Sequence, residues 1–220
     1  MGSILEALSP EQQIACSTQN NILLTACPGS GKTRTLTHRL AYQVLRDPAS
    51  KKIKIAITYT NRAAEEITNR LEGMNIDQSS IWAGTIHQFC MHFIIRPYAM
   101  YSKRLCKGYR IIDDYSKKAY GREIAERLGM HLNYYDDPFQ YENVRTEYKR
   151  VLKEKKEIDF DAILLISEEL LASCAFIGSN IASVISSILV DEFQDTNELQ
   201  YSILSTIYKA NKSIILMFVG

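Results

Sequence analysis

The residue types of a short glycine-rich stretch, ACPGSGKT (residues 26–33), are those that bind phosphates. Gly29 and Gly31 let the backbone bend so that successive N–H groups point inward at phosphate oxygens. Lys32 brings a positive charge to β- and γ-phosphates, and the hydroxyl of Thr33 can bind Mg²⁺. A tight loop with no further role is the alternative. The predicted strand before the stretch and the predicted helix after it favour phosphate binding.

A second stretch with suitable chemistry is ILVDEFQDT, residues 188–196. Its apolar start predicts a buried strand, and Asp191 then lies at the carboxyl end of that strand, where ligands bind in open parallel sheets. Asp191 suits Mg²⁺, directly or through water, and Glu192 can accept a proton from an attacking water. The alternative is a helix N-terminus enriched in acids. Beside a phosphate loop, the two acids favour a nucleoside triphosphatase over a kinase acting on a small acceptor.

The elements that must position these residues follow from the apolar pattern. Strands and helices are expected to alternate over residues 21–26, 32–45, 54–59, 61–73, 80–85 and 86–97. The same alternation resumes with a strand up to residue 190, a helix over 197–210 and a last strand at 213–220. This order predicts an α/β fold, with a parallel sheet flanked by crossover helices.

The middle of the chain has a different pattern. Long amphipathic stretches such as DDYSKKAYGREIAERLG carry few strand signals, which predicts an inserted all-helical subdomain. We therefore expect residues 1–99 and 187–220 to form one α/β domain and residues 100–186 to form the insertion.

The composition is that of a globular protein, with 46% hydrophobic and 23% charged residues in a chain of 220. No apolar run approaches the ~20 residues that span a bilayer, and the N-terminus lacks the pattern of a signal peptide. The five cysteines form no CxxC pair, and the four histidines lack metal-ligand spacing. These features argue against a disulfide framework, a zinc ribbon or a membrane partner, and they indicate a cytoplasmic protein.

Taken together and in order, several stretches resemble the motifs of UvrD/Rep-like DNA helicases of superfamily one. The stretches ACPGSGKT, ITYTNRAAEEITNRL, GTIHQFC and LVDEFQDTNELQ resemble motifs I, Ia, Ib and II. LSPEQQ resembles the family's Q motif, while GYRIIDD and KKEIDFDAILL resemble parts of its inserted 1B subdomain. The resemblance runs from about residue 8 to residue 220. It implies a RecA-like phosphate-loop NTPase domain, 1A, that uses ATP and Mg²⁺.

The resemblance also implies roles for residues of the ATP site. Thr33 and Asp191 would hold Mg²⁺, Glu192 would be the catalytic base, and Gln194 would sense the γ-phosphate. The ATP-binding set would be Gln12 at the adenine edge, the loop residues Ala26, Cys27, Pro28, Gly29, Ser30, Gly31, Lys32 and Thr33, and Arg34 beyond them. Cys27 stands where the family often has Gly, so ATP binding is expected to be sensitive to oxidation.

A single-stranded DNA track is implied at the ends of the second and third strands. Tyr59 stands where the family usually has Phe and would stack on a base, which is worth ~1–3 kcal/mol. The other residues of the implied track are Thr58, Thr60, Asn61, Arg62, Thr85 and His87. Structural roles stay open here, because Asn61 also suits a helix N-cap and Thr58 or Tyr59 could simply pack.

The function implied is that of the N-terminal part of an ATP-dependent DNA helicase or translocase, acting on single-stranded DNA and duplex junctions. Gly220 stands just before the family's motif III. We therefore expect a longer gene product whose second RecA-like domain supplies arginines to the ATP site, and little ATP hydrolysis by these residues alone.

Three alternatives remain open. A phosphate-loop kinase would explain the loop but not DEFQDT or GTIH, and the arginine-rich lid that would mark it is not found. An ATP-gated DNA-binding or partner clamp would bind without unwinding. A helicase subunit of a helicase–nuclease would have a nuclease partner, and the pathway, repair or otherwise, is not indicated.

Overall fold

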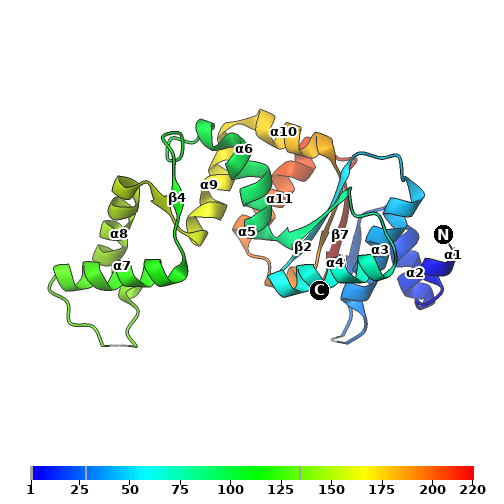
Figure 1. Cartoon of the computed structure of the whole chain (residues 1–220), viewed down its shortest axis with the longest axis horizontal. Coiled ribbons are helices and arrows are strands. Elements are labelled where there is room, and N and C mark those ends of the chain that lie inside the picture. Colours follow the sequence, from blue (N-terminus) through cyan, green and yellow to red (C-terminus); the bar gives the residue numbers. More distant parts are fainter. Residues whose placement is uncertain (1, 28, 134) are drawn as a thin grey trace. The chain divides into compact units, whose positions relative to one another are not determined.

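The computed structural model of the chain describes residues 2–27, 29–133 and 135–220. It divides into two compact units, residues 1–89 with 171–220 and residues 90–170 (Figure 1). The domain boundaries expected from the sequence, 99/100 and 186/187, stay a prediction, and the compact units divide at other residues. One reason is that helix α10 (Ala175–Val184), placed in the insertion by its sequence, packs against α11 (Glu198–Ala210) of the first unit.

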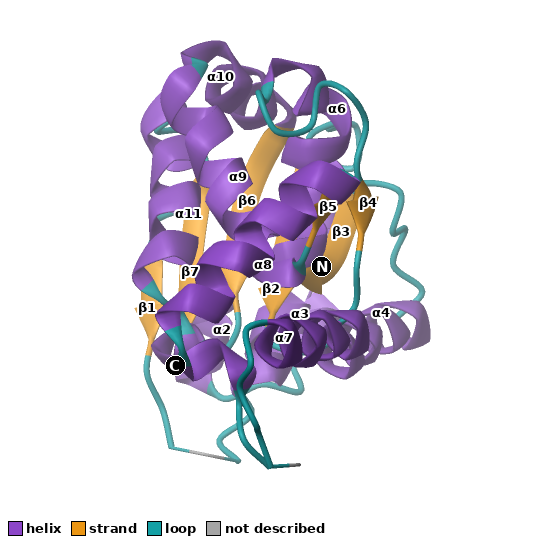
Figure 2. Ribbon diagram, turned by 90° about the vertical axis from the view of Figure 1, so that its left-hand side faces the viewer, coloured by secondary structure: helices purple, strands orange, loops and turns teal. Residues whose placement is uncertain are grey.

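The first unit is built on a five-stranded sheet in which every strand pair is parallel (Figure 2). The strand order is β1 (Ile22–Leu24), β7 (Ile215–Val219), β6 (Ile185–Val190), β2 (Ile53–Thr58) and β3 (Ile81–Thr85). This confirms the α/β fold with a parallel sheet. β1 is shorter than the expected strand over 21–26, because the chain turns into the glycine-rich loop.

The two faces of the sheet are covered by different helices. Ala56, Leu189 and Met217 lie side by side in register on one face. They pack there against α3 (Lys32–Arg46) and α4 (Asn61–Gly73), whose wholly buried contributions are Leu36, Leu40, Ile67 and Leu71. Helix α11 also contributes buried apolar side chains, Ile203, Leu204 and Ile207. Burial of each such side chain contributes about 1.5–3 kcal/mol to stability, which fixes the sheet on which the site is built.

Two helices precede the sheet, α1 (Gly2–Leu5) and α2 (Pro10–Ser17). The guanidinium of Arg39, on α3, is wholly buried and donates to the carbonyls of Ala15 and Asn20, at the end of α2 and just beyond it. The thiol of Cys16 donates to the carbonyl of Thr35 at 3.3 Å. These contacts fix α2 against the helix that follows the glycine-rich loop.

The single helix expected over residues 86–97 is wrong in detail. The chain forms α5 (Ile86–Phe89), then the π-helix η1 (Cys90–Ile95), then α6 (Arg96–Tyr98) and the 3₁₀ turn η2 (Ala99–Tyr101). Pro97 lies at the start of α6, where its missing backbone N–H leaves one hydrogen bond to the preceding turn unmade. The apolar pattern alone does not distinguish an α-helix from these wider and tighter turns.

The second unit contains α7 (Asp114–Arg127), the 3₁₀ turn η3 (Pro138–Gln140), α8 (Glu142–Lys155) and most of α9 (Phe160–Ser173). The expectation of an all-helical insertion misses one feature, the parallel pair β4 (Arg110–Ile111) and β5 (Glu157–Ile158). Each strand has only two residues, too few for an alternating pattern to appear in the sequence. The pair is held by the buried carboxylate of Glu157, which accepts from the guanidinium of Arg110.

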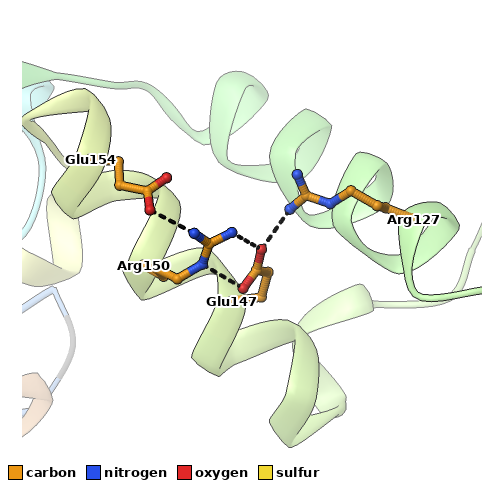
Figure 3. A network of polar contacts seen from close by, with 4 residues as sticks. All are labelled: Arg127, Glu147, Arg150 and Glu154. Atoms are coloured by element: carbon orange, nitrogen blue, oxygen red, sulfur yellow. Dashed lines mark hydrogen bonds and ion pairs between the residues drawn. The ribbon is translucent and has the colours of Figure 1, made fainter.

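Helices α7 and α8 are joined by both an apolar core and an ion-pair network. Glu147 accepts from Arg127 at 2.8 Å and from Arg150 at 2.6 Å, and Arg150 also donates to Glu154 (Figure 3). The two arginines and Glu154 are more than half exposed and Glu147 is 23% exposed, so each pair contributes under about 1 kcal/mol. Most of the stability of this unit comes from the core cluster beneath them: Ile112, Ile124, Ala125, Val144, Tyr148 and Leu152. Among the described helices, none combines the length and apolar character needed to cross a membrane.

Candidate functional site

The glycine-rich loop joins β1 to α3. Gly29 and Gly31 have φ values of +81° and +87°, in the left-handed region that glycine adopts without steric cost. Gly31 is the N-cap of α3, so the first N–H groups of this helix have no intrahelical acceptor and can bind an anion. The bend expected from the sequence is therefore confirmed at both glycines. Pro28, also expected to bind ATP, lies outside the described residues.

Gln12 lies against this loop. Its side-chain oxygen accepts from the backbone N–H of Ser9 at 3.0 Å and completes a capping box at the start of α2. Its side-chain nitrogen donates to the carbonyl of Ser30 at 3.1 Å. Both ends of the amide are thus used, one to begin the helix and the other to hold the loop. The predicted residue is brought to the loop, and its contact with adenine stays a prediction.

The two basic residues at the start of α3 point to different places. The Lys32 ammonium donates to the carbonyl of Ala26 at 3.0 Å, which holds it over the loop. The Arg34 guanidinium donates to the carbonyl of Ala7 at 2.8 Å, in the segment before α2. The structure therefore places the Lys32 ammonium at the loop, and its contact with phosphates stays a prediction. The hydrogen bond of Arg34 is directed to the N-terminal segment instead.

Thr33 and Asp191 meet across the sheet. The hydroxyl of Thr33 donates to a carboxylate oxygen of Asp191 at 2.9 Å. Asp191 directly follows β6, is only 5% exposed, and donates its backbone N–H to the carbonyl of Ile57. Burial raises the pKa of Asp191, and the neighbouring charge of Glu192 adds to the rise, while the Thr33 hydroxyl and Lys32 oppose it. The two residues predicted to hold Mg²⁺ are thus side by side.

The acidic turn after β6 has an unusual backbone. Glu192 has a φ of +51°, a left-handed conformation that is uncommon for residues other than glycine. The 3₁₀ turn η4 (Phe193–Asp195) follows, and the side-chain nitrogen of Gln194 donates to the Glu192 carboxylate at 2.6 Å. The candidate base is thus oriented by the residue that the sequence assigned to γ-phosphate sensing.

The end of β7 links the loop to the acidic turn. The Gly220 N–H donates to Leu24 at 3.0 Å, and the Gly220 carbonyl accepts from Ala26 at 3.2 Å, so pairing continues past β1 into the loop. A Cβ at Gly220 would lie 2.8 Å from the side-chain oxygen of Gln194, too close for any larger residue without a shift. Sequence reasoning did not assign Gly220 a place in the site, because this approach involves backbone atoms that no side-chain pattern reports.

A pocket of about 340 Å³ opens at the carboxyl ends of β2, β3 and β6. It is lined by four residues of the predicted DNA track, Thr58, Tyr59, Thr85 and His87, together with the two acids Asp191 and Glu192. Tyr59 is 69% exposed, so its ring is available to a ligand rather than packed in the core. The sequence missed Asp195, Thr196 and Gln200, which line the same pocket. Their position directly after the acidic pair was the available signal.

Two residues of the predicted track, Thr60 and Thr85, take part in capping helices. Thr60, with extended φ and ψ, is the N-cap of α4 and accepts from the N–H of Ala63 at 3.1 Å. The N-cap role considered for Asn61 is therefore wrong, because Asn61 is already the first helical residue. Thr85 and Gln88 form a reciprocal cap at the start of α5, at 2.9 and 3.3 Å. Asn61 and Arg62 are exposed and do not line the pocket between the strand ends.

Within the described residues, no group of three or more His, Cys, Asp or Glu side chains could hold a metal ion. The pair formed by Thr33 and Asp191 offers a hydroxyl and a carboxylate instead. Hard oxygen ligands of this kind, few in number, are typical of Mg²⁺ bound together with phosphates.

Several DNA helicases are similar to this chain in sequence. The chain is 27% identical to the ATP-dependent DNA helicase PcrA of Leuconostoc citreum and to DNA helicase II of Escherichia coli, over 90% of this chain and 30% and 31% of those proteins. It is 25% identical to PcrA of Staphylococcus aureus over 97% of this chain and 33% of that protein. The chain thus spans about a third of the length of these relatives. The family described as "UvrD/REP helicase N-terminal domain" matches residues 8–139 and 131–220. With its phosphate loop, acidic strand end and sheet accounted for, the chain belongs to this UvrD/REP helicase family.

Proposed function

We propose that this chain is the N-terminal, ATP- and single-stranded-DNA-binding part of an ATP-dependent DNA helicase or translocase. The observation that carries the proposal is the hydrogen bond between Thr33 and Asp191, because it joins the phosphate loop to the acidic strand end in one site. The family membership and the printed names of the relatives support the same reading. The activity of a longer protein is part of the proposal.

The residues present suit Mg²⁺. Asp191 is a buried carboxylate whose pKa is raised, chiefly by burial, so its negative charge lacks full compensation in the protein. Thr33 and Asp191 would hold the ion, which would neutralise charge on the β- and γ-phosphates of ATP. The site suits Mg²⁺ because its oxygen ligands are a hydroxyl and a buried carboxylate next to the phosphate loop.

The chain's own residues would do the remaining chemistry. Lys32 and the N–H groups of the loop and of the first turn of α3 would bind the phosphates. Glu192 would accept a proton from the water that attacks the γ-phosphate, and the hydrogen bond from Gln194 would hold its carboxylate in place. Gln194 also lies against Gly220 at the end of β7. It is therefore the residue through which the presence or loss of the γ-phosphate would be transmitted to the end of that strand.

The DNA track would begin in the pocket beside this site. Tyr59, Thr85 and His87 line it together with Glu192, so a strand bound there would lie next to the catalytic carboxylate. The exposed ring of Tyr59 would stack on a base. Single-stranded DNA and duplex junctions are the proposed partners, along with a second RecA-like domain. Residues 100–186 are proposed to correspond to the inserted 1B subdomain of the family.

Binding of ATP by the 220-residue chain tests the nucleotide half of this function. Lys32→Ala should weaken ATP binding by roughly 10- to 100-fold, since a charged hydrogen bond is worth about 1.5–3 kcal/mol. Lys51→Ala, at an exposed lysine away from the loop, is the matched control. Equal affinity in all three proteins, measured by calorimetry, would refute the site.

Measurement of ATP hydrolysis tests the second part of the proposed function, translocation on DNA. ATP hydrolysis should be barely detectable for this chain, and strongly stimulated by single-stranded DNA in a longer product of the same gene. A longer product that binds DNA and ATP without stimulated hydrolysis would instead indicate an ATP-gated clamp. Robust DNA-stimulated turnover by these 220 residues would overturn the expectation that a second domain completes the site.

A further inference from the structure

A second polar pocket, of about 300 Å³, lies at the amino ends of the strands. Its lining comes from the starts of β2, β6 and β7, from the last turns of α3, and from the segment between α3 and β2. The residues that line it and carry charge are Arg46, Lys52, Lys54 and Asp47. The nucleotide site lies at the carboxyl ends of the same strands, so the two sites are at opposite edges of the sheet.

Lys54 is the unusual residue of this pocket. It belongs to β2, a strand hydrogen-bonded on both sides, where apolar residues are expected. It is only 3% exposed, yet the one described hydrogen bond of its ammonium is a long one, 3.4 Å, to the carbonyl of Lys52. An ammonium has three N–H donors, and burying a charge costs free energy unless it is compensated. At least one donor therefore remains for a ligand in the pocket.

The surrounding groups are those that bind an oxyanion. Among the described residues, none of Arg46, Lys52 and Lys54 takes part in an ion pair. Asp47 lines the pocket with them and leaves the lining two positive charges in excess. Uncharged polar side chains complete the lining: Gln19, Gln43, Ser50, Ser186, Ser187 and Ser213. The hydroxyls of Ser186, Ser187 and Ser213 already donate within the protein, to Ile53, Gln43 and Asn211. Ser187 lies directly beside Lys54 in register, and its hydroxyl donates to the side-chain oxygen of Gln43 at 2.8 Å.

We propose that this pocket is a binding site for a small phosphate dianion, either orthophosphate or the terminal phosphate of a small phosphomonoester. Two negative charges match the excess of the lining, whereas the phosphodiesters of a DNA backbone carry only one each. A small ion can reach an ammonium recessed in the sheet, which a polymer backbone cannot. Burial lowers the pKa of Lys54, the charge of Asp47 opposes this effect, and a bound anion would oppose it further. The site is separate from the nucleotide site and does not depend on the proposed motor function.

The test must exclude the phosphate loop, which also binds phosphates. Orthophosphate is titrated by calorimetry into the Lys32→Ala chain and into the same chain carrying Lys54→Met, which keeps the buried stem and removes the charge. Saturable binding in the first and a loss of at least about tenfold in the second are expected. Lys51→Met, an exposed neighbour outside the lining, should leave the affinity unchanged.

A second variant guards against a folding defect at Lys54. Arg46→Gln changes an exposed residue of the lining and should also weaken orthophosphate binding several-fold while leaving the circular dichroism spectrum unchanged. A phosphomonoester such as glycerol 3-phosphate should compete with orthophosphate, and an oligonucleotide without terminal phosphates should not. The proposal is overturned if Lys32→Ala alone abolishes binding, if neither Lys54→Met nor Arg46→Gln weakens it, or if the oligonucleotide competes.

Discussion

The Thr33 hydroxyl donates to Asp191 at 2.9 Å, which connects the first turn of the helix after the glycine-rich loop with the end of a strand far along the chain. The parallel sheet creates this proximity, because β1 and β6 flank β7 and all three strands point to the same edge. The contact is between a neutral donor and a carboxylate that is almost wholly buried. Burial of this carboxylate should affect how the free energy of unfolding depends on pH, which can be measured.

Asp191→Asn should stabilise the chain at neutral pH in the absence of ligand. Burial first, and then Glu192, raise the pKa of Asp191 above its ordinary value of 3.8. The folded state therefore favours the protonated form, and ionisation of Asp191 lowers the free energy of unfolding as the pH rises from about 3.8 through the folded pKa. Asn can still accept from Thr33 but never ionises. Its advantage over the parent should grow with pH across that window in urea denaturation.

The control for this prediction is Asp195→Asn, at an exposed carboxylate of the same turn. It should show no comparable growth of its stability difference with pH. A constant difference for Asp191→Asn from pH 3 to 8 would contradict the burial argument.

Glu192→Gln should separate binding from turnover. The amide keeps the size of the side chain but cannot accept a proton, so ATP affinity should stay within about threefold. DNA-stimulated hydrolysis by a longer product of the gene should fall by about 10²- to 10⁴-fold. Glu198→Gln, in the first turn of α11, is the matched control and should keep full turnover. Near-normal hydrolysis by Glu192→Gln would rule out Glu192 as the base.

Gln194→Ala tests the orienting hydrogen bond on Glu192. The base would remain but lose its partner, and a hydrogen bond to a charged group is worth about 1.5–3 kcal/mol. Turnover should therefore fall by roughly 10-fold or more, with ATP affinity little changed. Gln194→Glu, which places a second negative charge beside Glu192, should be at least as damaging. Loss of ATP binding in parallel with turnover would indicate a structural role instead.

Tyr59→Ala should weaken binding of single-stranded DNA without altering ATP affinity. The ring is 69% exposed at the edge of the pocket, and stacking on a base is worth ~1–3 kcal/mol, or roughly 5- to 150-fold in affinity. Tyr59→Phe should retain binding, and Tyr115→Ala, at an even more exposed tyrosine of the second unit, should have no effect. Fluorescence anisotropy with a labelled oligonucleotide measures all three. Equal losses of DNA and ATP affinity would mean that Tyr59 supports the fold.

Peroxide should impair ATP binding through Cys27. This thiol is exposed within the phosphate loop, so an oxidised, negatively charged sulfur there would repel phosphates. Burial raises the pKa of Cys16 to about 11 and that of Cys90 to about 12, which leaves little reactive thiolate at either. Cys27→Ser should therefore make ATP binding insensitive to peroxide, while Cys106→Ser, at another exposed thiol, should not. Unchanged ATP binding after oxidation of the parent would refute the role of Cys27.

Local chemistry made much of this protein predictable from its sequence. Gly29 and Gly31 predicted a bend in the backbone, and both have the positive φ values that allow one. The alternation of strands and helices predicted the parallel sheet, because the periodicity of apolar side chains indicates which faces are buried. The errors occur where periodicity carries no signal. The strands at Arg110–Ile111 and Glu157–Ile158 are too short to show one, and the N-cap at Thr60 rather than Asn61 depends on backbone angles at a single residue.

By itself, the sequence determined the motifs, their order, and hence the family and the chemistry proposed for it. The tertiary structure alone decided which of these residues meet: Thr33 with Asp191, Gln12 with the loop carbonyl of Ser30, and Gln194 with Glu192 and Gly220. It alone revealed that Lys54, an ordinary lysine in the sequence, is buried at the opposite edge of the sheet. The physical reason is that residue type sets what a group can do, whereas strand order and register set what lies beside it.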